Sequence, residues 1–380
     1  MSVRIARRLD GLDRTLIRRI FDSAPKGAVN LGLGEPAMPT PATIALAGVQ
    51  GIVSGRTTYT STAGELALRA AVAGHYGSAL EGPESVLITS GSQEALFACC
   101  LALVDPGDEL LYPDPGYPAY ATVAHLVGAR PVAYELPTTN GFRPRFADLQ
   151  QHLSERTRLV ILNSPSNPTG SCLSRDEMGD LLASLSERGI AWISDEIYGG
   201  LRYESEAFSA LEMSDGGGLV VSGLSKELCM TGWRVGWVVG DPTVVSRILP
   251  VHQHLVTCAS SVSQNAALQA FSEEGYRARR ECLEIFRSRR DLMAEELSQL
   301  PAVSFDLPDG AFYFFVDVSE HGDDLELCRR ILERRQVITM PGQAFGARGK
   351  GYLRLSFGAT EEAIREGMAG IRRELNGAGF

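Results

Sequence analysis

Short apolar runs alternate with helical patterns through the middle of the chain. Residues 159–162 and 190–194 are almost entirely apolar, which is typical of strands buried on both faces. Residues 85–89 predict another strand, and residues 93–104 predict the helix that follows it. Because the order strand, loop, helix recurs from 85 to 240, we predict a mostly parallel sheet with ligands at the carboxyl ends of its strands.

The two ends of the chain show a different pattern. Apolar residues recur at helical spacing in residues 10–22 and 275–297, so both segments predict helices, and the second is long and heavily charged. Shorter strand patterns follow at 310–315, 337–342 and 352–357. The C-terminal part is therefore expected to alternate strands and helices on a smaller scale than the middle of the chain.

The length of 380 residues exceeds what one ordinary core accommodates. We predict an α/β fold in which a large domain, residues 35–280, forms three layers around a mostly parallel sheet. Residues 1–34 and 281–380 are expected to form a smaller α+β domain.

Charge and cysteine usage exclude several classes of protein. A net charge of −10 and a pI of about 5.2 disfavour binding to nucleic acid or to an anionic membrane. No apolar run approaches the roughly 20 residues of a membrane span, and the charged first ten residues lack the apolar core of a signal peptide. The seven irregularly spaced cysteines predict free thiols in the cytoplasm, and the histidines and cysteines lack the spacing of a metal site.

Lysine is rare in this chain, and one of the few lysines has unusual neighbours. Of 36 basic residues, three are lysines, Lys26, Lys226 and Lys350, and 36 − 3 = 33 are arginines. Lys226 follows the apolar run 219–221 and a Ser-Gly corner, where an unpaired ammonium is costly. Since only a primary amine can form a Schiff base with a carbonyl compound, Lys226 is a candidate nucleophile.

The segment Ser225-Lys226, followed by Met230-Thr231-Gly232-Trp233-Arg234-Val235-Gly236, resembles the lysine segment of class I aminotransferases. The resemblance implies that Lys226 forms a Schiff base with pyridoxal 5'-phosphate. It also implies that Ser225 and Arg234 hold the phosphate of this cofactor.

A loop of small residues supports the same cofactor. Gly91, Ser92 and Gln93 join a predicted strand to a predicted helix, and backbone N–H groups at such a turn suit an anion. The alternative is ordinary capping of the helix by Ser90 or Ser92. The resemblance favours a shared phosphate and places Tyr117 against the pyridine ring, whereas we interpret Tyr120 as a packing residue.

Polar residues follow the next two predicted strands. A carboxylate at the end of an apolar strand, here Asp195, needs a cationic partner or serves as a helix cap. The resemblance implies that Asp195 faces the protonated pyridine nitrogen, which makes the ring an electron sink. It also implies that Asn167 and Tyr198 contact the phenolic oxygen of the cofactor. We interpret Glu196 as a solvated acid in the first turn of a helix.

Three further residues are assigned by resemblance alone. Gly34, in a Gly-Glu-Pro loop, is implied to touch the substrate carboxylate, although Ala37 stands where the family often has Asp. Arg354 is implied to bind the same carboxylate through its planar fork, and a surface arginine on an edge strand is the alternative. Tyr59 is implied to reach the cofactor phosphate of a neighbouring subunit in a homodimer, and a half-buried packing tyrosine is the alternative.

The chain is therefore similar to fold-type-I, pyridoxal-phosphate-dependent class I aminotransferases over about residues 30–360. This implies ping-pong transfer of an amino group between an L-amino acid and a 2-oxo acid, with the amino donor left open. A lyase, decarboxylase or oxidase on the same scaffold is the alternative, because a fold does not determine its reaction. A more remote alternative is an aminotransferase-like regulatory domain.

Overall fold

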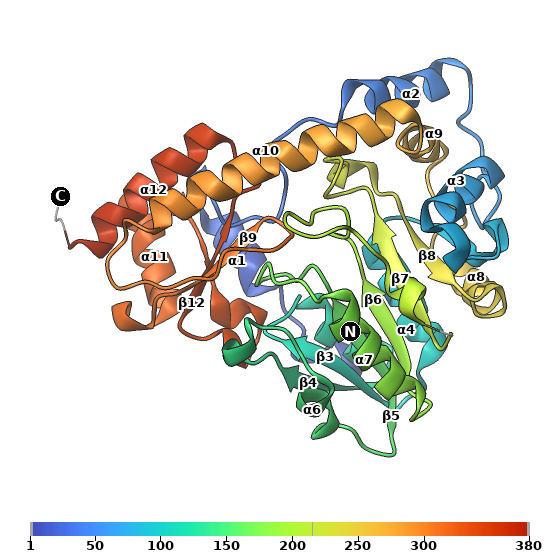
Figure 1. The fold of residues 1–380 in the computed structure, drawn as a ribbon, viewed down its shortest axis with the longest axis horizontal. Helices are drawn as coiled ribbons and strands as arrows, with labels where there is room; N and C mark the ends of the chain where they lie inside the picture. Colours follow the sequence, from blue (N-terminus) through green and yellow to red (C-terminus); the bar gives the residue numbers. More distant parts are fainter. Residues whose placement is uncertain (1–2, 215, 378–380) are drawn as a thin grey trace.

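The computed structural model describes residues 3–214 and 216–377, and its largest element is a twisted central sheet (Figure 1). Seven strands of the described chain form it in the order β2-β8-β7-β6-β5-β3-β4, and every strand except β8 runs in the same direction. The strands are β2 (Val86–Thr89), β3 (Glu109–Asp114), β4 (Arg130–Glu135), β5 (Thr157–Asn163), β6 (Ala191–Asp195), β7 (Gly218–Gly223) and β8 (Gly236–Gly240). The predicted mostly parallel sheet is confirmed.

Helices cover both faces of this sheet. Side chains of a strand alternate between its faces, so Leu159 and Ile161 of β5 pack into one apolar cluster, whereas Val160 and Leu162 pack into another. The first cluster includes residues of α4 and α5, and the second includes residues of α3 and α7. The helices of this region are α3 (Leu66–Tyr76), α4 (Ser92–Leu103), α5 (Ala119–Leu126), α6 (Phe146–Gln150), α7 (Arg175–Ser186), α8 (Pro242–Val256) and α9 (Ser261–Gln269).

A separate core forms beside the central sheet from the two ends of the chain. An antiparallel sheet has the order β11-β12-β9, and β1 pairs with β10 in a short parallel ladder. The strands of this part are β1 (Val29–Asn30), β9 (Tyr313–Asp317), β10 (Val337–Ile338), β11 (Met340–Pro341) and β12 (Tyr352–Ser356), and its helices are α11 (Asp324–Arg335) and α12 (Glu361–Leu375). Helices α1 (Leu16–Ser23) and α2 (Ala42–Val53) pack instead against a cluster of the central sheet, and α10 (Glu273–Leu297) contacts both cores.

The long helix α10 connects the two cores. Figure 1 shows it running from α2 and α9 to α12. Ala278 near its beginning packs into a cluster of the central sheet, whereas Phe286 and Met293 pack into the second core. The predicted boundary at residue 280 falls inside this helix, and the division into two domains stays a prediction.

Two predicted elements begin later in the structure than the sequence predicted, and the strand predicted over 337–342 divides into β10 and β11, which pair with different strands. The helix predicted over 10–22 begins only at Leu16, because the hydroxyl of Thr15 accepts a hydrogen bond from the N–H of Arg18 and caps it there. The strand predicted over 310–315 begins at Tyr313, since Ala311 has a left-handed backbone (φ 54°).

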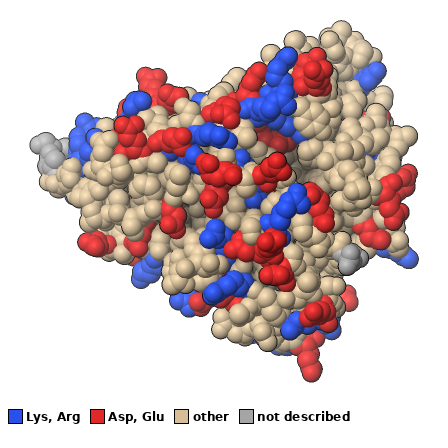
Figure 2. Space-filling view, viewed as in Figure 1, with Lys and Arg blue, Asp and Glu red and all other residues tan. Residues whose placement is uncertain are grey.

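The surface carries both acidic and basic side chains, as the composition of the chain leads one to expect. Acidic and basic side chains are interspersed on the face seen in Figure 2. No helix among the described residues is both long and apolar enough to cross a membrane.

Candidate active site

A cavity of about 400 Å³ lies where the carboxyl ends of the central strands meet the second core. The parallel pairing of β5 with β6 places Asn163 opposite Asp195, so residues after these two strands face the same space. Most of the predicted site residues line this cavity: Gly34, Ser92, Gln93, Tyr117, Asn167, Asp195, Tyr198, Ser225, Lys226, Arg234 and Arg354. Gly91 lies just behind the wall, against Arg234, and Tyr59 lies elsewhere.

Lys226 reaches the cavity from the end of β7. Its Nζ donates a hydrogen bond of 2.8 Å to the carbonyl oxygen of Gly34. Burial and the charges of Arg354 and Arg234 lower the pKa of Lys226 to about 8, although Glu35 and Asp195 oppose the shift. An amine with this pKa is partly unprotonated near neutral pH, as a nucleophile or proton acceptor must be.

Asp195 is a buried carboxylate with one neutral donor on each oxygen. Its Oδ2 accepts a hydrogen bond of 2.7 Å from the hydroxyl of Tyr120, and its Oδ1 accepts one of 3.2 Å from the N–H of Ile197. Burial raises its pKa, whereas both hydrogen bonds and Lys226 lower it. No basic side chain of residues 3–214 or 216–377 forms an ion pair with it, so Asp195 can serve a cation bound in the cavity.

The interpretation of Tyr120 was incomplete and that of Glu196 was wrong. Tyr120 is fully buried, as a packing residue is, but its hydroxyl also orients Asp195. Glu196 is buried rather than solvated, and its Oε1 accepts hydrogen bonds from Ser194, Ser209 and the N–H of Ala210. Burial raises the pKa of Glu196 to about 7. The local sequence did not reveal this, because the segment around residue 209 that covers Glu196 arrives from farther along the chain.

The beginning of α4 and Arg234 form a site for an anion. No side chain caps α4, contrary to the alternative of capping by Ser90 or Ser92, so N–H groups of its first turn remain available. Arg234 has a left-handed backbone (φ 55°), and its Nη1 donates to the carbonyl of Thr231. A side chain at Gly91 would place its Cβ 2.5 Å from the Arg234 guanidinium, so only glycine lets the two approach.

Ser225 and Tyr117 complete this side of the cavity. Ser225 is buried in its wall beside Lys226. The hydroxyl of Tyr117 donates a hydrogen bond of 3.0 Å to Gln93, and its ring meets the edge of Tyr120 at 5.6 Å between centroids. Tyr117 is therefore fixed at both ends.

Arg354 is a buried guanidinium that lacks an acidic partner among the described residues. It lies on β12, the middle strand of its sheet, which rules out the alternative of an edge-strand arginine on the surface. Nη1 donates to the side-chain oxygen of Asn167 at 2.9 Å, Nη2 donates to the carbonyl of Gly32, and Nε has no hydrogen-bond partner. Because a buried charge with only neutral partners is costly, this fork suits the carboxylate of a ligand.

Tyr313 is a site residue that sequence reasoning missed. It lines the cavity, and its hydroxyl lies 2.7 Å from the hydroxyl of Tyr198. The sequence showed only a short strand pattern. A usable signal was that Tyr313 is the one residue with a polar group in the run from Phe312 to Phe315.

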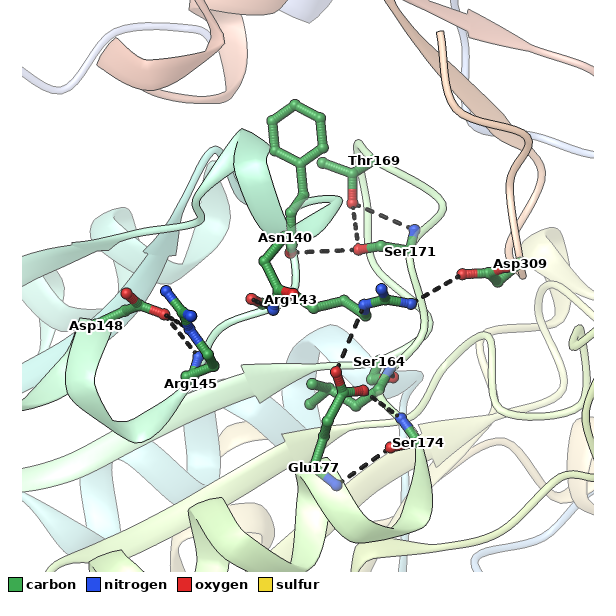
Figure 3. Close-up of polar contacts among 12 residues, drawn as sticks. Asn140, Arg143, Arg145, Asp148, Ser164, Thr169, Ser171, Ser174, Glu177 and Asp309 are labelled. Carbon is green, nitrogen blue, oxygen red and sulfur yellow. Dashed lines mark hydrogen bonds and ion pairs between the residues drawn. The ribbon is translucent and has the colours of Figure 1, made fainter.

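The loop that carries Asn167 is tied to neighbouring segments by the contacts in Figure 3. Ser171 lies 2.8 Å from the hydroxyl of Thr169 and donates to the carbonyl of Phe142. The guanidinium of Arg143 lies 3.6 Å from Glu177 of α7 and 3.9 Å from Asp309, which precedes β9 (Figure 3). These contacts join the Asn167 loop to the segment that leads to Tyr313.

The residues of the cavity fit pyridoxal phosphate. The first turn of α4 with Arg234 and Ser225 suits its phosphate, Asp195 suits a protonated pyridine nitrogen, and Lys226 suits its aldehyde. No group of three or more potential metal ligands occurs among the described residues.

Comparisons with known proteins give a consistent result. The family model described as aminotransferase class I and II matches residues 26–371. The aspartate aminotransferase of Pyrococcus horikoshii is 33% identical over 98% of this chain and 97% of its own length. The (5-formylfuran-3-yl)methyl phosphate transaminase of Methanocaldococcus jannaschii is also 33% identical, over 96% of each chain. The solved structure of Thermus thermophilus aspartate aminotransferase with maleate has a TM-score of 0.92 and 30% identity, over 98% of this chain and all of that one.

Proposed function

Because this chain belongs to the class I and II aminotransferase family, we propose that the cavity of about 400 Å³ is its transamination site and that Lys226 is its catalytic lysine. The chain is a pyridoxal-phosphate-dependent transaminase of fold type I, as predicted, and acts on amino and 2-oxo acids. A lyase, decarboxylase, oxidase or regulatory domain is not favoured, since the relatives compared above are aminotransferases.

One observation supports the assignment of the site above all others. The amine of Lys226, the buried carboxylate of Asp195 and the buried guanidinium of Arg354 line a single cavity. Lys226 follows β7, Asp195 ends β6, and Arg354 lies on β12 of the other sheet. The amine suits the aldehyde of the cofactor, the carboxylate suits its cationic ring nitrogen, and the guanidinium suits the carboxylate of a substrate.

When bound, pyridoxal phosphate supplies the carbonyl group that takes up the amino group and the ring that stabilises negative charge. Arg234, Ser225 and the first turn of α4 would hold its phosphate. Asp195 would keep its ring nitrogen protonated, Tyr117 would support the ring, and Asn167 and Tyr198 would bind its phenolic oxygen. The cavity positions and hydrogen-bonding groups described above support these assignments.

Lys226 and Arg354 would act on the substrate. The Arg354 fork binds the α-carboxylate, and Gly34 lines the same cavity next to it. Lys226 Nζ then takes a proton from the α-carbon of the amino acid and later returns one. Its lowered pKa, about 8, suits both directions of transfer near neutral pH.

We further propose a homodimer whose protomers complete each other's sites, in the cytoplasm. Tyr59 is 85% exposed and lies outside the cavity of its own chain, as a residue that serves a partner would. Nearby in the sequence, α2 exposes Leu46, Val49 and Val53, which repeat at helical spacing and form an apolar face. The seven free cysteines support a reducing compartment.

Chemical trapping tests the proposed site. The purified protein, loaded with pyridoxal phosphate, is reduced with borohydride and digested, and the modified peptide is sequenced by mass spectrometry. We expect the pyridoxyl group on Lys226, and we expect Lys226→Ala to lose transaminase activity. A modification on Lys26 or Lys350 would refute the proposal, as would normal turnover by Lys226→Ala.

A further inference from the structure

The hydroxyl of Tyr313 forms the closest polar contact of Tyr198. The two phenol oxygens lie 2.7 Å apart, and both side chains are buried. Burial raises the pKa of each phenol, so both are neutral near pH 7 and one donates its hydrogen to the other. If Tyr313 is the donor, the hydrogen of Tyr198 is free to point away from Tyr313 and into the cavity.

The ring of Tyr313 makes a second contact with the site. The guanidinium carbon of Arg354 lies 4.4 Å from the centre of this ring and 4.5 Å from that of Phe345, so the fork lies between two aromatic rings. Arg354 makes no ion pair with the described residues that would orient it. The two rings, with the oxygens of Asn167 and Gly32, therefore determine where the fork points.

Tyr313 also reaches the loop that holds the lysine. A Cβ at Gly34 would lie 2.2 Å from the Tyr313 hydroxyl oxygen, so this hydroxyl lies directly against Gly34. The carbonyl of the same glycine accepts the hydrogen bond of Lys226. One side chain thus contacts Tyr198, Arg354 and Gly34.

We propose that Tyr313 is a positioning residue with two separable functions: its hydroxyl orients the phenol of Tyr198 toward the cofactor, and its ring orients Arg354 toward the substrate carboxylate. This inference rests on the functions proposed above for Tyr198 and Arg354. It predicts that removing the hydroxyl and removing the ring have different effects.

A double-mutant cycle tests the function of the hydroxyl. Tyr313→Phe, Tyr198→Phe and the double variant are compared by kcat, by KM and by the Kd for pyridoxal phosphate, measured from tryptophan fluorescence of the cofactor-free chain. Each single variant should lower kcat and weaken cofactor binding by up to about tenfold, the size expected for one buried hydrogen bond. The double variant should be no worse than the more severe single variant, since the two hydroxyls act as one unit.

A second pair of variants tests the function of the ring. Tyr313→Phe should leave KM for both substrates near its normal value, whereas Tyr313→Leu should raise both by about tenfold because one aromatic face of Arg354 is lost. Phe345→Leu removes the other face and should raise KM without changing the Kd for the cofactor.

Tyr203→Phe is the matched control for damage to the segment before β9. Its hydroxyl donates to the carbonyl of Ala311, two residues before Tyr313, and has no contact with Tyr198. Its kcat and cofactor Kd should stay near those of the unmodified protein. Equal losses in Tyr203→Phe and Tyr313→Phe would overturn the inference, and so would additive losses in the double variant. An unaffected Tyr198→Phe would remove the proposed function of Tyr198 and this inference together.

Discussion

The amine of Lys226 donates its hydrogen bond to the carbonyl oxygen of Gly34, which lies 192 residues earlier in the chain, at 2.8 Å. A backbone carbonyl stabilises a donor without neutralising its charge. The ammonium of Lys226 therefore carries the cost of burial and of two nearby arginines, which explains the direction of its pKa shift.

The reactivity of Lys226 should follow this shift. The pKa of about 8 lies below the ordinary 10.5, so the neutral amine forms as the pH rises through about 8 rather than through 10.5. Competitive acetylation of the cofactor-free chain, followed by mass spectrometry, should show labelling of Lys226 that rises with pH and has its midpoint at about pH 8. Arg354→Met removes a charge that lowers the pKa and should move this midpoint upward. A midpoint near 10.5 in the unmodified chain would contradict the prediction.

Replacing Arg354 by lysine should weaken substrate binding. A point charge cannot reproduce the planar fork, so KM for amino and 2-oxo acids should rise by an amount equivalent to about 2–3 kcal/mol. Arg289→Lys is the control, because Arg289 is also buried and donates to a carbonyl, that of Gly358, but does not line the cavity. Steady-state kinetics with both substrates checks this, and an unchanged KM for Arg354→Lys would exclude it from the substrate site.

The hydrogen bond from Tyr120 should lower the pKa of Asp195. Removing it by Tyr120→Phe takes away the largest effect that lowers the pKa of this carboxyl, so the pKa should rise further. Since the ionised carboxylate is the active form, the acidic limb of the profile of kcat/KM against pH should move to higher pH, while the alkaline limb stays in place. Asp195→Asn should lose most of kcat at every pH. An unshifted acidic limb in Tyr120→Phe would show that Asp195 does not control it.

Burial of Glu196 should make stability depend on pH. The pKa is about 7 in the folded chain and 4.5 when unperturbed, so the folded state binds the proton more tightly. The contribution of Glu196 to the free energy of unfolding should therefore be largest below pH 4.5 and should fall as the pH rises to about 7. Glu196→Gln removes the effect and should stabilise the chain by about 1–3 kcal/mol at pH 8 relative to pH 5.

Thermal unfolding at the two pH values measures this difference. Glu284→Gln, on the exposed surface of α10, is the control and should change the unfolding temperature equally at both. The prediction would be contradicted if Glu196→Gln destabilised the chain more at pH 8 than at pH 5.

The exposed face of α2 should form the dimer interface. Val49→Asp places a charge in the apolar row of this helix and should shift the protein toward monomers in sedimentation velocity. Leu307→Asp is the control: it places the same charge at an exposed apolar residue outside α2 and should leave the dimer intact. If Tyr59 completes the partner's site, mixed dimers of Tyr59→Phe and Lys226→Ala should contain one repaired site. A fully active monomer would contradict both expectations.

The sequence by itself determined the parallel sheet, the lysine segment and the positions of Asp195 and Asn167. These features are local: an apolar run makes a buried strand, and the residues just after it must lie at its carboxyl end. The same local order placed Gly91 in the turn between a strand and a helix, and the structure then showed that this glycine lies against Arg234.

Tertiary structure alone decided which of these groups are buried and what they contact. Arg354 meets Asn167 across 187 residues, and Tyr198 meets Tyr313 across 115. Glu196 was misinterpreted because its burial comes from segments that its neighbours in sequence do not specify. Burial and nearby charges lower the pKa of Lys226, and one of these charges is Arg354 of β12, so no local pattern determines this shift. Burial raises the pKa of Asp195, and the hydroxyl that opposes the shift comes from Tyr120, 75 residues earlier in the chain.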